Sequence, residues 1–332
     1  MTRNRQWRLA AHPVGRALAD GDLLLAEAAL SAPGPGEMQL KTLYLGFDPA
    51  QKGWMENVAD YVAPMAIGDV MRGSAILEVT ASNGGRFPVG TVLAGSSTWS
   101  EYVVHSGEGL NPCEPGLPPT AMLSVLGTTG MTAWCGLFKI GRPIPGDVVL
   151  VSGAAGATGS IVGQLARLAG CTVIGIAGGA EKCAWLVNEA GYDHAIAYKA
   201  GPIRAQIKAL APRGVDVIFD NVGGGILNDM LSQIATGARV VICGGISRYE
   251  TGQLPAGPEN YFNLVFRRAR MEGFIVIDWA AEFPAIRQRL VALVQAGSVT
   301  FREDLQHGFE NAPQTLQRLF SGANRGKQLL KL

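Results

Sequence analysis

The stretch that decides the fold of this chain reads Val148-Val-Leu-Val-Ser-Gly-Ala-Ala-Gly-Ala-Thr-Gly159. Its first four residues form an apolar, mostly β-branched run, which is typical of a strand buried on both faces of a parallel sheet. Its second half has almost no side chains, and residues 160–169 then place apolar side chains at helical spacing. A strand, a glycine turn and a helix in this order predict the opening of a dinucleotide-binding βαβ unit.

The glycine turn explains how such a unit would bind a diphosphate. Backbone N–H groups at the start of a helix have no partner and carry partial positive charge, so they attract a phosphate. Gly156 lets the backbone approach the phosphates, and Gly159 lets the helix pack close to the strand. Ala154 replaces the usual first glycine of this fingerprint, and no Gly-Lys-Ser/Thr follows, so the stretch is not a P-loop. A structural turn in an unrelated α/β domain is the alternative interpretation of the stretch alone.

Length and composition set the broad class of protein. The chain is long enough for about two domains. Its net charge of +1, without a basic stripe or a long block of like charge, argues against a nucleic-acid or membrane partner. No apolar run reaches the ~18 residues of a membrane span, and no signal-peptide core follows residues 1–9. The cysteines are scattered, odd in number and without a CxxC pattern, which indicates a reducing, cytoplasmic compartment: Cys113, Cys135, Cys171, Cys183 and Cys243.

The first 120 residues read as a β-rich domain. Short apolar or alternating runs between glycine and proline turns predict strands at 40–45, 74–80, 91–94 and 102–104. The proline-rich segment 111–119 predicts a domain boundary, and a helix-like region interrupted at 127–130 follows it at 121–139. The apolar run 327–332 is expected to return to the first domain as a strand.

Beyond the glycine turn, predicted strands alternate with predicted helices. The strands are at 172–177, 194–198, 215–219, 238–243 and 274–278, and the helices at 181–190, 203–210, 226–234 and 283–296. This alternation predicts a parallel, doubly wound sheet. The fold class is therefore α/β, with a β-rich domain over 1–122 completed by 297–332, and a nucleotide-binding domain over 123–296.

The end of the second predicted strand of this sheet distinguishes the two nicotinamide cofactors. An NAD-binding protein presents Asp or Glu there, to accept a hydrogen bond from the ribose 2′-OH. Here the strand ends in Ala177-Gly178-Gly179, and Lys182 follows near the start of the next helix, where an ammonium suits a phosphate dianion. Tyr198 adds a hydroxyl and Lys199 a second cation, so the pattern favours NADPH. Glu181 is the observation against this choice, and a solvated helix position is the alternative interpretation of Lys182.

Ligands of an open α/β sheet lie beyond the carboxyl ends of its strands. Asn221, on the loop 220–224, is a candidate to hydrogen-bond a ribose or the carboxamide. The backbone near Cys243 and Gly244 is expected to flank the nicotinamide. The alternative interpretation is that the glycines in these loops only allow the chain to turn where a strand ends.

No zinc-ligand pattern involves the four histidines, His12, His105, His194 and His307, so a catalytic zinc is not expected. Hydride transfer without a metal suits a conjugated C=C bond, where negative charge builds up on the carbonyl oxygen. That oxygen needs a neutral donor that stays protonated at pH 7, and tyrosine, with a pKa of ~10, fits. Tyr249, on a loop at the cofactor edge, is the first choice, and Tyr61 of the other domain is the second. A partly buried loop tyrosine is the alternative interpretation of each.

The chain resembles the zinc-independent medium-chain dehydrogenase/reductase superfamily, in its branch of NADPH-dependent alkenal/enone double-bond reductases. Prostaglandin reductases, curcumin reductase and plant double-bond reductases belong to this branch. The matching stretches run through nearly the whole chain in family order, at 44–49, 126–133, 149–164, 219–224, 243–249, 257–261, 271–276 and 310–313.

The resemblance implies a GroES-like β-rich domain, a Rossmann domain, NADPH as cofactor, a small α,β-unsaturated carbonyl substrate and a homodimer. It implies that Lys182 and Tyr198 hold the 2′-phosphate, that Tyr249 orients or stabilises the enolate and that Tyr61 lies near the substrate. The other cofactor contacts that it implies are Thr132, Ala155, Gly156, Asn221, Cys243, Phe274, Val276 and Asn324. Gly159, Gly178 and Tyr249 complete the predicted cofactor set.

One stretch departs from the family. After Asp48-Pro49 the family commonly carries Tyr/Phe-Met-Arg-Gly-Arg-Met, whereas this chain has Ala50-Gln-Lys-Gly-Trp-Met55. Because this loop borders the substrate pocket in the family, Ala50 and Trp54 leave the substrate open. A quinone reductase on the same scaffold and a non-catalytic NADPH-binding protein are the alternatives to a C=C reductase.

Overall fold

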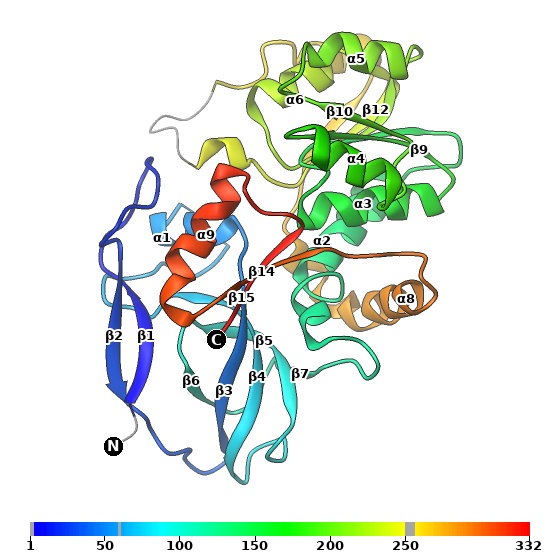
Figure 1. Cartoon of the computed structure of the whole chain (residues 1–332). Helices are drawn as coiled ribbons and strands as arrows, with labels where there is room; N and C mark the ends of the chain where they lie inside the picture. Colours follow the sequence, from blue (N-terminus) through cyan, green and yellow to red (C-terminus); the bar gives the residue numbers. More distant parts are fainter. Residues whose placement is uncertain (1–2, 59–60, 250–255) are drawn as a thin grey trace. The chain divides into compact units, whose positions relative to one another are not determined.

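The computed structural model describes residues 3–58, 61–249 and 256–332 of a chain that divides into two compact units (Figure 1). Unit 1 comprises Met1–Ser124 together with Glu303–Leu332. Unit 2 comprises Val125–Arg302. Unit 1 is therefore assembled from both ends of the chain, and unit 2 from its middle.

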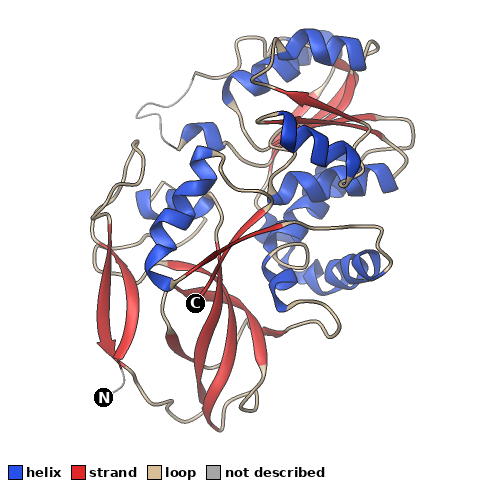
Figure 2. Ribbon diagram, viewed as in Figure 1, coloured by secondary structure: helices blue, strands red, loops and turns tan. Residues whose placement is uncertain are grey.

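Unit 1 is built around a seven-stranded sheet in the order β14-β15-β3-β4-β5-β7, with β6 paired to β3 (Figure 2). The C-terminal strand pairs antiparallel with β3, with Leu330 opposite Leu45, so the tail returns to this unit as the sequence predicts. Both leucines are fully buried. The strands are β3 (Glu37–Gly46), β4 (Arg72–Asn83), β5 (Val92–Thr98), β6 (Tyr102–His105), β7 (Asn111–Pro112), β14 (Glu303–His307) and β15 (Lys327–Lys331).

A separate hairpin and several short helices complete unit 1. Trp7 and Leu9 of the hairpin join one apolar core with Met38, Leu45 and Leu316. The hairpin is not predictable from the sequence pattern, because polar and charged residues separate its few core residues. Its strands are β1 (Arg3–Leu9) and β2 (Leu23–Ala29), and the helices of the unit are α1 (Ala50–Glu56), η1 (Pro119–Leu123), η5 (Phe309–Asn311) and α9 (Ala312–Ser321).

Unit 2 contains a six-stranded sheet in the order β10-β9-β8-β11-β12-β13, and every pairing in it is parallel. The chain starts at β8, moves outward through β9 and β10, and then crosses back to β11, so the order reverses between β8 and β11. Ligands of doubly wound sheets bind at such a switch point. The strands are β8 (Val148–Val151), β9 (Thr172–Ala177), β10 (His194–Ala197), β11 (Val215–Asp220), β12 (Ile234–Ile242) and β13 (Arg270–Gly273).

Helices cover both faces of this sheet. Ile203, Ile207 and Leu227, from the helices after β10 and β11, pack with Leu150 and Ile174 in one core. The helices after β8 and β9 contact the strands that precede and follow them. The helices of the unit are α2 (Thr128–Cys135), η2 (Gly136–Gly141), α3 (Ala157–Leu168), α4 (Ala180–Asn188), α5 (Ile203–Leu210), α6 (Gly224–Leu231), η3 (Ile246–Arg248), α7 (Asn263–Arg267), η4 (Val276–Glu282) and α8 (Phe283–Gln295).

Three expected elements of unit 2 were placed wrongly. The sixth strand is Arg270–Gly273 rather than 274–278, because an exposed polar edge strand lacks an apolar signal, whereas the Phe274 ring packs against Gly136. The helix expected at 226–234 ends at Leu231, and Ile234 begins β12. The interruption expected at 127–130 lies at 124–127, because η1 ends at Leu123 and α2 begins at Thr128, so Gly130 lies inside α2. A Cβ atom at Gly130 would lie 1.8 Å from the Val125 carbonyl oxygen, so this glycine serves a close backbone approach.

No helix in the described ranges is both long enough and apolar enough to cross a membrane.

Candidate active site

The glycine turn after β8 presents bare backbone amides. Gly156 is the N-cap of α3 and no side chain caps the helix. The first-turn amides of a helix have no acceptor within the helix, and Ala157 and Thr158 here are only half-buried. An anion at this position would supply the missing acceptors and meet the positive end of the helix dipole. The turn therefore fits the diphosphate of a dinucleotide.

Close packing holds this turn in place. A Cβ atom at Gly159 would lie 2.5 Å from the Gly153 carbonyl oxygen and 2.8 Å from the Cα of Ala154. Gly153 itself has a φ of 57°, in the left-handed region that favours glycine. The Ala154 methyl would be only 2.9 Å from a Cβ at Gly175 of β9. Because Gly175 has no side chain, there is room for Ala154 at the position where the dinucleotide-binding fingerprint usually has its first glycine.

A second set of predicted residues gathers where β9 and β10 end. A Cβ at Gly178 would lie 3.6 Å from Cε1 of Tyr198 and 3.7 Å from its hydroxyl, so the phenol lies beside the glycine. The Tyr198 amide donates to the Ala177 carbonyl over 3.1 Å. Lys182 is half-buried in the first turn of α4, a helix that no side chain caps. The Tyr198 hydroxyl, the Lys182 ammonium and the start of α4 thus lie at one edge of the sheet. This combination of donors suits the 2′-phosphate of NADPH.

Asn221 is held at the switch point by two hydrogen bonds to Ser152. Its side-chain amide donates to the Ser152 carbonyl over 2.7 Å, and its backbone amide donates to Ser152 Oγ over 2.8 Å. A Cβ at Gly153 would lie 3.4 Å from the Asn221 Cβ, so the asparagine lies beside the glycine turn. The oxygen and the second N–H of its side-chain amide remain for a ligand.

Asp220 organises the loops of three neighbouring strands. It is fully buried and accepts hydrogen bonds from the Ser152 hydroxyl (2.6 Å) and the Gly223 amide (2.9 Å). Its backbone carbonyl accepts from the Cys243 amide over 2.9 Å. Burial raises the pKa of this carboxyl group, and the hydrogen bonds oppose that rise. Asp220 is a functional residue that was not predicted, although an acidic residue at the end of an apolar strand is a recognisable signal.

Tyr249 stands at the end of a loop that is fastened to the same edge. Ser247 Oγ donates to the Val222 carbonyl over 2.6 Å, and the Ile246 amide donates to the Asn221 carbonyl over 3.3 Å. One turn later, the Tyr249 amide donates to the Ile246 carbonyl over 3.3 Å. The backbone of Tyr249 is thereby tied to the loop that carries Asn221.

The remaining predicted contacts of unit 2 differ in what they offer a ligand. Burial, reinforced by the nearby Asp220 charge, raises the pKa of the Cys243 thiol to about 12, so it is protonated at neutral pH. The Phe274 ring is half-buried, packs against Gly136 and lies 5.8 Å from the Trp279 ring. Thr132 donates its hydroxyl to the Thr128 carbonyl over 2.8 Å, which leaves its oxygen as an acceptor. Val276 begins η4 and is half-buried, and Ala155 is buried within the glycine turn.

Tyr61 and Asn324 belong to unit 1. Tyr61 is 39% exposed, and its hydroxyl oxygen accepts a hydrogen bond from Trp54 Nε1 over 3.3 Å. Trp54 is part of α1 and packs on the core of the unit. Asn324 is buried and donates its side-chain amide to the Gly326 carbonyl over 2.9 Å.

Within the part of the chain that the structure describes, no group of three or more His, Cys, Asp or Glu side chains could hold a metal ion.

Known proteins match this chain over its whole length. The family described as N-terminal domain of oxidoreductase matches residues 5–113, and the family described as zinc-binding dehydrogenase matches residues 157–292. The putative NADP-dependent oxidoreductase YfmJ of Bacillus subtilis is 39% identical, covering 99% of this chain and 97% of the relative. The NADPH-dependent curcumin reductase of Escherichia coli is 34% identical with the same coverage. Prostaglandin reductase 1 of Bos taurus is 37% identical over 100% of both chains.

Solved structures show the same relationship. CurA from Vibrio vulnificus in complex with NADPH is 36% identical, with a TM-score of 0.92 over 98% of both chains. The quinone oxidoreductase of Escherichia coli complexed with NADPH has a TM-score of 0.79 at 17% identity over 100% of both chains. The second likeness shows the fold alone.

Proposed function

The chain belongs to the zinc-independent branch of the medium-chain dehydrogenase/reductase superfamily, and we propose that it reduces the C=C bond of α,β-unsaturated ketones and aldehydes with NADPH. The observation that carries this proposal is the uncapped glycine turn of unit 2, flanked by Asn221 on one side and by the Gly178–Tyr198 pair on the other. The names of the relatives support it, because they include an NADP-dependent 2-alkenal reductase of Nicotiana tabacum that is 36% identical over 90% of this chain and 88% of the relative.

When bound, NADPH supplies a hydride to the β-carbon of the substrate. In the proposal, the first-turn amides of α3 hold the diphosphate, and Gly156 and Gly159 keep side chains out of its way. Lys182 and Tyr198 hold the 2′-phosphate through charge-assisted hydrogen bonds. Asn221 orients the ribose or the carboxamide from its fixed position on Ser152.

A tyrosine is assigned to the substrate's carbonyl oxygen. As the β-carbon is reduced, negative charge develops on that oxygen, and a neutral hydrogen-bond donor stabilises it without giving up its proton first. Tyr249 is the first candidate, because its loop is fastened to the edge that carries Asn221. Tyr61 is the second candidate. Its oxygen accepts from Trp54 Nε1, and its own O–H remains to donate to a substrate.

We also propose that the enzyme is a homodimer that assembles through the β13 edge of unit 2. β13 is the last strand of the sheet, and all four of its residues are exposed. Large apolar side chains that are more than half exposed lie on α7 and the turn before it: Tyr261, Phe262, Val265 and Phe266. An open strand edge beside an apolar patch favours pairing with a second copy across a twofold axis.

The proposal places the enzyme in the reducing environment of the cytoplasm. All five cysteines are free thiols in the structure, and two of them, Cys135 and Cys171, are buried. A chain that builds its core without disulfides does not need an oxidising compartment to fold.

The test is a substrate panel. The protein is mixed with NADPH and, separately, with an enone, an alkenal, curcumin and a quinone, and the loss of absorbance by the reduced nicotinamide is followed. We expect turnover of the enone or alkenal, with a product heavier by two hydrogens in mass spectrometry. Turnover of the quinone alone would favour a quinone reductase, and NADPH binding without any turnover would favour a non-catalytic role.

A further inference from the structure

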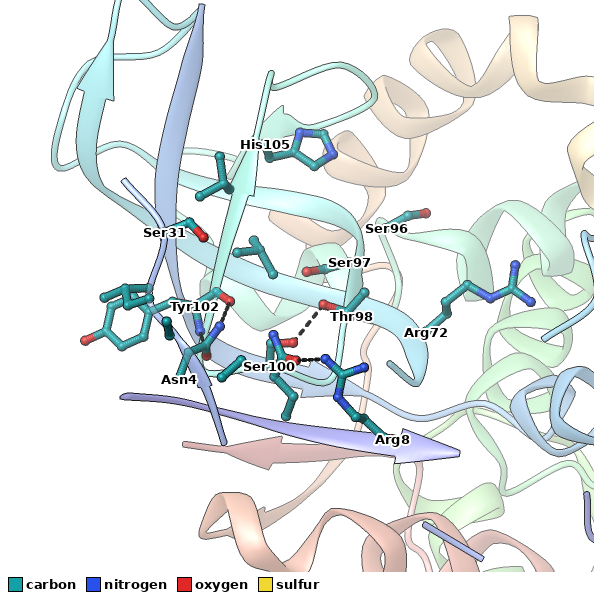
Figure 3. A pocket seen from close by; sticks show the side chains of 16 residues that line it. Asn4, Arg8, Ser31, Arg72, Ser96, Ser97, Thr98, Ser100, Tyr102 and His105 are labelled. Carbon is teal, nitrogen blue, oxygen red and sulfur yellow. Dashed lines mark hydrogen bonds between the residues drawn. The ribbon is translucent and has the colours of Figure 1, made fainter. Parts of the chain in front are cut away.

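A cavity of about 570 Å³ lies wholly within unit 1, between the β1–β2 hairpin and strands β5 and β6 (Figure 3). This volume is in the range of ~300–1,000 Å³ that small-molecule sites occupy, and it is much larger than a single inorganic ion requires. The cavity shares no lining residue with the proposed active site.

The wall of the cavity is positively charged. Arg8 and Arg72 line it, and none of its described lining residues is Asp or Glu. Arg8 donates to the Gly68 carbonyl and to the side-chain oxygen of Gln6, both over 2.7 Å, and Arg72 donates to the Ala63 carbonyl over 2.6 Å. These acceptors are neutral. In the described ranges, neither guanidinium takes part in an ion pair, so neither charge has a carboxylate partner.

The rest of the wall is suited to a ligand that is mostly polar and has a small apolar part. On β5, Ser96 and Thr98 carry their hydroxyl groups on one face of the strand, and Ser97 between them points to the opposite face. Thr98 and Ser100 share a hydrogen bond of 3.0 Å between their hydroxyls, and Ser96 is exposed. Val103 and Val104 of β6 supply apolar contact.

The cavity is preformed, because the hairpin is fastened to the sheet beside it. Asn4 donates to the Tyr102 carbonyl over 2.8 Å and accepts from the Tyr102 amide over 2.9 Å, in place of a strand partner (Figure 3). Arg5 and Glu101 form an ion pair of 2.7 Å, and Gln6 bridges to Ser100. A ligand would therefore not have to order the walls, which lowers the entropic cost of binding.

We propose that this cavity binds a small polar molecule that carries a carboxylate or phosphate group. The guanidinium groups of Arg8 and Arg72 supply the attraction for the oxyanion, since each has N–H donors beyond those used for the protein's own carbonyls. The hydroxyl groups on β5 hydrogen-bond to the other polar groups of the bound molecule. No lining residue of the cavity belongs to the proposed active site, so either proposal can be correct without the other.

The experiment is calorimetric titration of the protein saturated with NADP⁺, so that the cofactor's own phosphate positions are filled. The probes are inorganic phosphate, citrate and a hexose phosphate, and free hexose is the neutral control. We expect citrate or the hexose phosphate to bind at one saturable site, with an affinity that falls as salt is added. Citrate alone would identify a carboxylate ligand, and the hexose phosphate alone a phosphate ligand.

A matched pair of variants locates the binding. Ser96→Asp adds one negative charge to the wall and Ser96→Asn adds nearly the same volume without charge. We expect the first to weaken binding about tenfold or more and the second to bind like the unaltered protein. Arg8→Gln, which removes a positive charge, should weaken binding as well, and its thermal unfolding shows whether it is folded. No saturable binding of any anion, equal binding of the free hexose, or unchanged affinity in Ser96→Asp would overturn the proposal.

Discussion

The indole nitrogen of Trp54 lies 3.3 Å from the phenol oxygen of Tyr61 and donates a hydrogen bond to it. An indole N–H has no acceptor capacity, so the direction of this hydrogen bond is fixed and the Tyr61 hydroxyl keeps its own proton to donate. This chain therefore places an indole N–H beside the tyrosine hydroxyl.

Trp54→Phe tests whether this hydrogen bond supports Tyr61, because it keeps an aromatic ring and removes the N–H. If Tyr61 donates to the substrate, kcat/KM for an enone should fall roughly threefold to tenfold, the range of one neutral hydrogen bond. In a Tyr61→Phe background the same change should have no further effect. An equal loss in both backgrounds would mean that Trp54 acts through packing alone.

Tyr249→Phe tests the first candidate for the enolate donor. Removing one donor to a developing oxyanion should lower kcat by about ten- to a thousandfold. The dissociation constant of NADPH, measured by fluorescence titration, should change little, because the ring remains. Tyr61→Phe measured in parallel shows which tyrosine carries the larger effect. If both variants kept the full rate, the tyrosine mechanism would be wrong.

Lys182→Ala tests cofactor selection. Losing a charge-assisted contact to the 2′-phosphate should weaken NADPH binding about tenfold or more. Binding of NADH, which lacks that phosphate, should hardly change and is the internal control. Tyr198→Phe should act in the same direction and to a smaller extent. A parallel loss for both cofactors would place Lys182 away from the 2′-phosphate.

Gly159→Ala tests the packing of the glycine turn, and Gly178→Ala is its matched control. A methyl group at Gly159 would lie 2.5 Å from a carbonyl oxygen, whereas at Gly178 the nearest atom would be 3.6 Å away. We expect the first variant to lose about 1–3 kcal/mol of unfolding free energy and most of its NADPH affinity. The control should be close to unaltered in urea unfolding. Equal stability of the two variants would contradict the close approach.

Phe266→Glu tests the proposed dimer. The side chain is 65% exposed on α7, and a charge there would have to be buried unpaired in a twofold interface. Light scattering coupled to size exclusion should show a monomer. Val89→Glu, at a position that is 61% exposed in unit 1, should leave the dimer intact. A dimer that persists in Phe266→Glu would show that α7 lies outside the interface.

The parts of the fold that were predictable have local signals. The run Val148–Val151 and the glycines after it identify β8 and the start of α3 without any tertiary information. Strand β1 lacked such a signal, since its core residues stand among arginines. The exposed edge strand β13 was placed wrongly for a similar reason, because it is buried on neither face and shows no apolar run.

The parts of the site that lie within a single turn were predictable from the sequence. The parts that depend on how two strands align with each other were not. Val151 pairs with Phe219 in the parallel sheet, so the next residues, Ser152 and Asp220, meet across the switch point and hold Asn221. The sequence shows each of these residues but not their alignment. The hydrogen bond from Trp54 to Tyr61 likewise joins α1 to a loop, and the cavity of unit 1 depends on how a hairpin docks onto a sheet.

The pairing of β15 with β3 has a consequence for how the protein is made. Strand β15 leaves the ribosome after both strands that flank it, β14 and β3, and Leu329 and Leu330 are fully buried between them. Unit 2 is complete in sequence at Arg302, whereas the sheet of unit 1 lacks a central strand until residues 327–331 have been made. A nascent chain stalled before residue 327 would thus hold a finished nucleotide-binding unit and an incomplete sheet in unit 1.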